Sequence, residues 1–169
     1  MDALEVIFSR RSVRLYTPKP VSREVLREIL KAAMSAPSAG NERPWHFLVL
    51  TDRAVLDEIP TFHPYSAMLK YASAAVLVCG DLTLERHAGY WVLDCAAATQ
   101  NILLAAHAKG LGGVWCGVYP TDDRIKNLRR LLKLPEHIVP FSLVPLGFPA
   151  EVKETPDRFD HSRVHDNKW

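Results

Sequence analysis

One long apolar stretch, residues 86–109, limits the folds that this chain can adopt. Its spacing predicts a single helix that ends near Gly110, a residue typical of the position just after a helix. A helix that is apolar on nearly every side is usually buried on every side. In a chain of only 169 residues, we therefore expect a second copy of the protein to cover part of it. The apolar residues of the stretch are Val92, Leu93, Ala96, Ala97, Ile102, Leu103, Leu104, Ala105 and Ala106.

The whole chain, residues 1–169, predicts a single domain, because 48% of its residues are hydrophobic and no linker interrupts it. Pro140 and Pro145 lie within the last expected strand and indicate an edge position or irregular ends. Helical spacing is found in residues 2–9, in the segment from the N-cap Ser22 to Pro37, and in 53–59, 64–71 and 122–132. Strands are expected at 45–50, 74–79, 111–118 and 138–146.

A basic cluster, Arg10-Arg11-Ser12-Val13-Arg14, follows the first expected helix. The guanidinium group is planar and always charged, and it binds phosphate through two parallel hydrogen bonds. Three arginines and one hydroxyl within five residues therefore indicate a site for a fixed anion, most simply a phosphate. The alternative is a basic turn that is only solvated.

A second loop, residues 35–44, is rich in small and polar residues. Small side chains let backbone amides approach a flat ligand closely. Asn41 can donate and accept at once, which matches the alternating carbonyl and N–H groups on the pyrimidine edge of a flavin. Because Pro, Ser, Gly and Asn are also turn formers, an ordinary turn is the alternative.

Bulk properties argue against several classes of partner and location. A formal net charge of +2 does not indicate a nucleic-acid partner, and no apolar stretch is long enough to cross a membrane. Asp2 and Glu5 interrupt the start, so we expect no signal peptide and a cytoplasmic location. Cys79, Cys95 and Cys116 show no paired metal spacing, and we expect reduced, mostly buried thiols.

No conventional catalytic set is present in the sequence. The seven histidines are scattered without metal-binding spacing, so no metal site is predicted. Ser12 and Ser38 lack the glycine-framed turn of a hydrolase nucleophile, and neither a dinucleotide-binding glycine pattern nor a Walker loop occurs. We therefore predict no catalytic side chain, which fits a protein whose bound cofactor carries the chemistry.

The basic cluster and the second loop together resemble the nitroreductase family of flavin enzymes. The resemblance covers residues 10–14, 37–45, 94–115 and 145–149 and extends into the C-terminal tail. It implies an α+β fold, nitroreductase-like, with a central mixed β-sheet flanked by helices. It also implies an intertwined homodimer that shares its FMN sites at the interface, with residues of about 150–169 forming a tail that docks on the partner subunit.

The resemblance also assigns positions to the FMN site. Arg10, Arg11 and Ser12 would hold the phosphate and ribityl chain, and Arg14 would lie nearer the pyrimidine side of the ring. One tail arginine would complete the phosphate site, with Arg158 favoured over Arg163. The remaining cofactor contacts would come from Pro37, Ser38, Ala39 and Asn41 of the partner subunit, and from Trp115, Cys116, Gly117, Pro145, Leu146 and Gly147.

The substrate side is less closely matched. The family commonly has glutamine before the Pro-Trp pair, whereas this chain has Arg43, so substrate preference does not transfer directly. The segment between residues 50 and 74, where a substrate lid often lies, is short. His63, Tyr65 and Tyr71 are its polar aromatic residues, and they would either form a lid or pack against the long helix.

The expected activity is that of an FMN-dependent oxidoreductase. NAD(P)H would reduce the flavin, leave, and be replaced by an electron-poor small-molecule acceptor such as a nitroaromatic or quinone, in a ping-pong order. Three alternatives remain at this stage. They are reductive dehalogenation or flavin fragmentation on the same scaffold, a flavin-binding protein without turnover, and a nucleic-acid-binding module built on residues 10–14.

Overall fold

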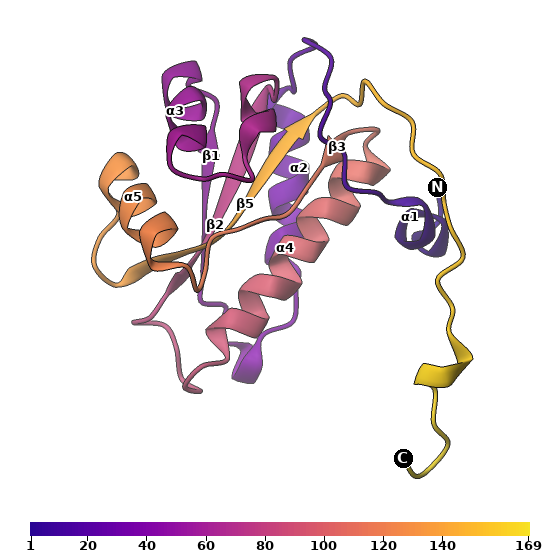
Figure 1. The fold of residues 1–169 in the computed structure, drawn as a ribbon. Helices are drawn as coiled ribbons and strands as arrows, with labels where there is room; N and C mark the ends of the chain where they lie inside the picture. Colours follow the sequence, from indigo (N-terminus) through magenta and orange to yellow (C-terminus); the bar gives the residue numbers. More distant parts are fainter.

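A computed structural model describes residues 1–169 and shows three layers, with a β-sheet between two layers of helices (Figure 1). Helices α2 and α4 cover one face of the sheet, and α3 and α5 cover the other. The chain also contains four short 3-10 turns. The helices are α1 (Ala3–Ser9), α2 (Arg23–Met34), α3 (Arg53–Glu58), α4 (Trp91–Ala108) and α5 (Asp122–Leu132).

The sheet has the order β1-β2-β5-β3, and β4 also pairs with β5. All pairs between these strands are antiparallel. The parallel component of the predicted mixed sheet is one isolated bridge between Ser12 and Gly113. The strands are β1 (Trp45–Leu50), β2 (Ala74–Asp81), β3 (Gly112–Gly113), β4 (Cys116–Gly117) and β5 (Ile138–Gly147).

Strand β5 is central, so the prediction of an edge position from its two prolines was wrong. It pairs with β2 on one side and with β3 and β4 on the other. Pro140 is tolerated because the register shifts between Val78 and Cys79, where an extra residue bulges from the ladder. The edge strand is instead β1, which explains why its middle residues are partly exposed rather than buried as predicted.

Three other predicted elements differ from the structure. The helix expected at 64–71 is only a 3-10 turn, Ala67–Lys70. Helix α4 begins at Trp91, because residues 86–90 form a turn whose amides bond elsewhere. The predicted strand 111–118 is split into β3 and β4, because Val114 and Trp115 between them turn away to line a cavity.

Burial against both faces of the sheet produces two apolar clusters. Side chains alternate along a strand, so Val76 and Val78 of β2 face α2 and α4 while Leu77 faces the other layer. On the first face, α2 contributes Leu26 and Ile29, both almost fully buried. Each layer of helices is therefore held by its own half of the core.

Helix α4 is not buried on every side within one chain. Its inner face is buried, but Leu93 is 61% exposed and Ala96, Ala97 and Leu104 are only partly covered. The apolar composition of the helix therefore exceeds what this chain can cover. No helix of the structure combines the length and apolar character needed to cross a membrane.

The C-terminal tail leaves the body of the molecule and extends along one side (Figure 1). Residues 152–169 are all exposed, and Trp169 is fully exposed. The three cysteines are buried, as predicted. Docking of the tail on a partner subunit stays a prediction.

Gly80→Ala tests the packing of α4 on the sheet. A Cβ atom at Gly80 would lie 2.3 Å from the Trp91 ring, so we expect the variant to lose about 1–3 kcal/mol of unfolding free energy. Gly117→Ala is the matched control, since a Cβ there meets nothing within 4 Å. Urea unfolding of both variants measures the difference, and equal stabilities would contradict this account of the packing.

Candidate functional site

The basic cluster is held by backbone pairing with the start of the tail. Ala150 N–H donates to Leu15 O at 2.9 Å, and Arg11 Nε donates to Glu154 O at 2.9 Å. The two segments run in opposite directions, so the tail residues that follow pass beside the beginning of the chain. This pairing places Arg158 next to the N-terminal arginines, although the two positions are far apart in the sequence.

Glu151 fixes the same pairing from the tail side. Its carboxylate accepts the backbone N–H groups of Arg14, at 2.7 Å, and of Leu15, at 3.3 Å. The Arg14 bond outweighs the effect of burial and lowers the pKa of Glu151 below its ordinary value. The carboxylate is therefore ionised at neutral pH and keeps the tail attached to the basic cluster.

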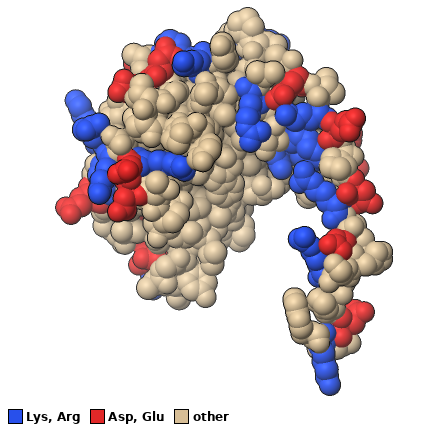
Figure 2. Space-filling view, viewed as in Figure 1, with Lys and Arg blue, Asp and Glu red and all other residues tan.

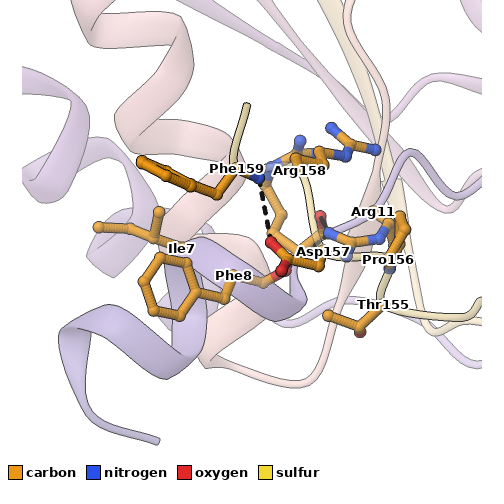
Figure 3. Close-up of a pocket in the computed structure, with 9 residues that line it drawn as sticks. Ile7, Phe8, Arg11, Thr155, Pro156, Asp157, Arg158 and Phe159 are labelled. Carbon is orange, nitrogen blue, oxygen red and sulfur yellow. Dashed lines mark hydrogen bonds between the residues drawn. The ribbon is translucent and has the colours of Figure 1, made fainter. Parts of the chain in front are cut away.

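The first pocket lies where the tail passes helix α1, and it encloses about 650 Å³. Figure 3 shows Ile7, Phe8 and Phe159 grouped on one side, with Arg11 and Arg158 on the other. Figure 2 shows lysines and arginines gathered on this side of the molecule, where the tail leaves the body. The lining residues are Ile7, Phe8, Arg10, Arg11, Thr155, Pro156, Asp157, Arg158 and Phe159.

Positive charge in the first pocket is incompletely neutralised. Burial, together with the nearby Arg11 and Arg158, lowers the pKa of Arg10. Arg11 Nη1 donates to the Phe8 and Arg10 carbonyls, but its buried Nη2 has no hydrogen-bond partner. Asp157, the one acidic lining residue, accepts the Phe159 N–H at 3.0 Å and forms no ion pair (Figure 3). The pocket is therefore suited to an anion.

The second tail arginine lies outside this pocket. Arg163 donates through Nε to Asp160 Oδ2 at 3.0 Å, and its side chain is 84% exposed. Of the two tail arginines proposed from the sequence, the structure brings only Arg158 to Arg10 and Arg11.

The second pocket, of about 470 Å³, begins at Arg14 on the same N-terminal segment. It has an aromatic and apolar lining, and neither a carboxylate nor an imidazole is among its residues. Burial raises the pKa of the Cys116 thiol to about 11, so this group is neutral at physiological pH. The lining residues are Arg14, Pro64, Tyr65, Ala67, Met68, Val114, Trp115, Cys116 and Gly117.

Close backbone contact joins the two pockets. Ser12 forms its bridge with Gly113, and Val13 N–H donates to Gly113 O at 3.0 Å. A Cβ atom at Gly112 would lie 2.6 Å from the Val13 side chain, so only glycine allows this approach. Behind this contact are Pro145, Leu146 and Gly147, which support the segment and line neither pocket.

The second loop lies at the opposite end of α4. Ala39 N–H donates to Asp94 Oδ1 at 3.0 Å near the start of that helix, whereas Ser9 next to the basic cluster bonds to His107 near its end. Thirteen residues of α-helix separate the two, about 20 Å. Pro37, Ser38, Ala39, Asn41 and Arg43 consequently line neither pocket of their own chain.

The expected lid residues have separate positions. His63 is completely buried, with Nε2 2.9 Å from Gly117 O, and it lines neither pocket, so its assignment to a substrate contact gains no support here. Tyr65 is 69% exposed and lines the second pocket. Tyr71 is exposed and lies near Lys70 and Ser73 instead. The segment packs under the sheet on the side opposite α4, so the prediction of packing against the long helix was wrong.

Several lining residues were missed in the sequence analysis. Arg124 of α5 donates to Gly117 O at 2.8 Å and lies over the Tyr65 ring, 5.2 Å from its centre, so it places a second cation beside the second pocket. Asp157 and Phe159 belong to an irregular tail without a periodic signal. The exposed apolar face of α1, with Ile7 and Phe8, was the available signal for the first pocket.

Arg158→Gln tests the first pocket as an anion site. With inorganic phosphate at about ten times its Kd, we expect wild-type protein to gain about 1.4 kcal/mol of unfolding free energy. Arg158→Gln should lose most of this gain, while the control Arg163→Gln should keep it, because Arg163 points away to Asp160. Thermal unfolding with and without phosphate measures both. An equal loss in the two variants would contradict the assignment.

Comparison with known proteins agrees with this geometry. The model of the nitroreductase family matches residues 7–78 and 66–148. A Methanothermobacter thermautotrophicus protein named "Putative NADH dehydrogenase/NAD(P)H nitroreductase" is 54% identical over 100% of this chain and 88% of its own. A Bacteroides thetaiotaomicron crystal structure of the same name has a TM-score of 0.94 at 45% identity, covering 99% of this chain and 98% of that one. The Clostridium difficile "FMN-dependent Nitroreductase" has a TM-score of 0.91 at 29% identity, covering 98% and 99%. The chain therefore belongs to the nitroreductase family.

Proposed function

We propose that this protein is an FMN-dependent oxidoreductase that takes electrons from NAD(P)H and passes them to an electron-poor acceptor such as a nitroaromatic or a quinone. The observation that carries the proposal is the buried, unpartnered Nη2 of Arg11, in a pocket that Arg10 and Arg158 also line. A phosphate oxygen is the partner that this arrangement lacks. The C. difficile relative, whose name states FMN dependence, supports the same cofactor.

The residues present fit FMN in two parts. Arg10, Arg11 and Arg158 would hold the phosphate in the first pocket, with Ser12 next to them on the same strand of chain. The isoalloxazine ring would use the aromatic and apolar second pocket, where Arg14 supplies a positive charge. When bound, FMN supplies the hydride and single-electron chemistry that no side chain of the site provides.

The lining of the second pocket supports the assignment of the redox chemistry to FMN rather than to a side chain. Arg14 and the neighbouring Arg124 make its surroundings positive, which favours the binding of an electron-rich, anionic ligand ring. The Cys116 thiol is neutral and the lining contains no imidazole or carboxylate. We infer that protons needed by the acceptor come from solvent rather than from a side chain.

Exposed apolar surface supports the homodimer. Leu4 and Phe8 of α1 and Leu93 of α4 are each more than 60% exposed. A groove of about 580 Å³ separates α1 from α2 and α4 and is lined mostly by apolar side chains. A second copy that covers these helices would bury them. It would also bring residues 37–43 of its second loop, here called the 37–43 loop, toward the pockets. The tail could then dock on the same partner.

Reconstitution with FMN tests the activity. The protein should bind added FMN, and NADH or NADPH added without oxygen should bleach the bound flavin. Arg11→Gln should weaken FMN binding by about tenfold or more, because it removes the charge-assisted hydrogen bond that Nη2 would donate to the phosphate, a contact worth about 1.4 kcal/mol or more. Absorbance titration and anaerobic spectra measure both steps. A flavin that binds but is not bleached would contradict the NAD(P)H step alone.

Initial rates test the order of the reaction. If donor and acceptor occupy the single second pocket in turn, double-reciprocal plots at several acceptor concentrations should be parallel. Intersecting lines would instead require both substrates to be bound at once and would contradict the shared pocket.

Mixed dimers test whether the 37–43 loop acts across the interface. Consider a heterodimer of one Arg11→Gln subunit and one Asn41→Ala subunit. If each loop contacts the FMN of the partner subunit, one site combines both substitutions and the other site carries neither. Such heterodimers should therefore bind about half the wild-type amount of FMN with wild-type affinity. If each loop serves its own chain, every site carries one alteration and no wild-type site appears. Titration of differently tagged, co-purified subunits distinguishes the two arrangements.

A further inference from the structure

Two carboxyl groups are buried against each other at the base of the 37–43 loop. Glu42 is 7% exposed and Asp94 is 4% exposed. One oxygen of each is already used, since Glu42 Oε2 accepts the N–H groups of Arg86 (2.6 Å) and His87 (3.1 Å), and Asp94 Oδ1 accepts that of Ala39 (3.0 Å). The two carboxyl groups are close enough to shift each other's pKa, and their remaining oxygens, Glu42 Oε1 and Asp94 Oδ2, are buried without a hydrogen-bond partner.

Such a contact requires a proton. A carboxylate can only accept hydrogen bonds, so two ionised groups would face each other as unpaired like charges in a poorly solvated place. Neither carboxylate forms an ion pair with a lysine or arginine. The other titratable groups close enough to act on the pair are Glu85, which acts on Asp94, and His87, which acts on Glu42.

The two groups differ in their preference for the proton. Burial raises the pKa of Asp94, and the neighbouring Glu42 raises it further, although the Ala39 N–H opposes both. Burial would also raise the pKa of Glu42, but the N–H groups of Arg86 and His87 outweigh it, and the pKa lies below its ordinary value. The proton therefore resides mainly on Asp94, and Glu42 is ionised.

We propose that Asp94 and Glu42 share one proton, and that this O–H···O bond is the latch that holds the 37–43 loop on α4. Glu42 and Asp94 are positioning residues in this arrangement, since neither lines a pocket. The consequence for flavin rests on the proposed function, in which the latched loop presents Asn41 to the partner subunit's FMN. The latch itself does not depend on that function.

The conformation of the loop explains why it needs a latch. Gly40, Asn41 and Arg43 all have φ between 46° and 56°, in the left-handed region. That region is unfavourable for residues other than glycine, so a loop with two such residues relaxes unless it is tied down. Within the loop, Arg43 N–H donates to Ser38 Oγ at 3.0 Å. The Glu42–Asp94 pair connects the loop to α4, and the hydrogen bonds of Glu42 connect it to the 86–90 turn.

The pH dependence follows from the raised pKa of Asp94. A carboxyl group whose pKa is higher in the folded than in the unfolded protein stabilises the fold at low pH and loses this contribution as pH rises through the folded pKa. Above that pH, both carboxylates are charged and the latch opens. Above that pH, the loop amides of the wild-type protein should therefore exchange faster with solvent, and the affinity for FMN should fall.

Amide variants separate the proton from the shape of the side chains. In Asp94→Asn, the side-chain oxygen can still accept the Ala39 N–H while the NH2 group donates to Glu42. In Glu42→Gln, the oxygen can still accept the Arg86 and His87 N–H groups while the NH2 group donates to Asp94. Each single variant should keep the latch and lose its alkaline sensitivity. In the double variant, both oxygens are used by the backbone and two NH2 groups meet, so the latch should fail at every pH.

Two measurements on wild type, both single variants and the double variant test the proposal. Hydrogen exchange of the Ala39, Arg86 and His87 amides in flavin-free protein, from about pH 6 to about pH 9, reports the latch directly after correction for intrinsic exchange. FMN affinity at neutral pH should be near wild type in each single variant and about tenfold weaker in the double variant, a loss of about 1.4 kcal/mol.

Each contrary result has a definite meaning. Single variants as unprotected as the double variant would overturn the shared proton. Alkaline loss that persists in both single variants would place its origin outside the Glu42–Asp94 pair and would also overturn the proposal. The expected exchange pattern in a protein that takes up no FMN would support the latch and refute the proposed function, so the two ideas fail separately.

Discussion

Uncompensated positive charge in the first pocket is the constraint on which the arrangement of the site depends. Burial, together with the nearby Arg11 and Arg158, lowers the pKa of Arg10, so bringing these like charges together costs free energy. The cost is offset by backbone pairing between the N-terminal segment and the start of the tail. The ionised carboxylate of Glu151 strengthens this pairing by accepting the Arg14 N–H. A bound phosphate would relieve the repulsion, so affinity for an anion is built into the fold.

Glycine at two positions makes one continuous site from two pockets. Gly112 and Gly113 let the segment after α4 touch Val13, and the same segment then turns to line the second pocket with Trp115 and Cys116. The sheet supplies the rigid backing through β5. In the proposed function, the contacts to FMN would therefore be distributed along two short backbone segments and would not depend on one reactive side chain.

The sequence predicted the regular elements well because their signals are local. Ser22 caps α2 as expected, and the periodic apolar positions of α2 and α5 face the core. Predictions failed where the outcome depends on distant partners. The prolines of β5 indicated an edge, but a bulge opposite Val78 and Cys79 accommodates one of them in the centre of the sheet. Burial of His63 beneath β4 has no local signal either.

The site was predictable in part, through residue chemistry and family resemblance together. The arginine cluster indicated an anion, whereas the choice of Arg158 over Arg163 needed the path of the tail. The Glu42–Asp94 pair was missed because its members are distant in sequence. A signal was available, since Asp94 is the one acidic residue in a mostly apolar helix, and a buried carboxyl group needs a polar partner.

The length of α4 has a consequence for sequence change in this protein. The helix connects the loop at Asp94 with the region of His107, and one inserted residue would rotate everything beyond it by about 100° and shift it by about 1.5 Å. Such an insertion would turn one anchored end away from its contacts while leaving the other in place. Insertions and deletions should therefore be excluded from α4, because its length sets the distance between the two ends.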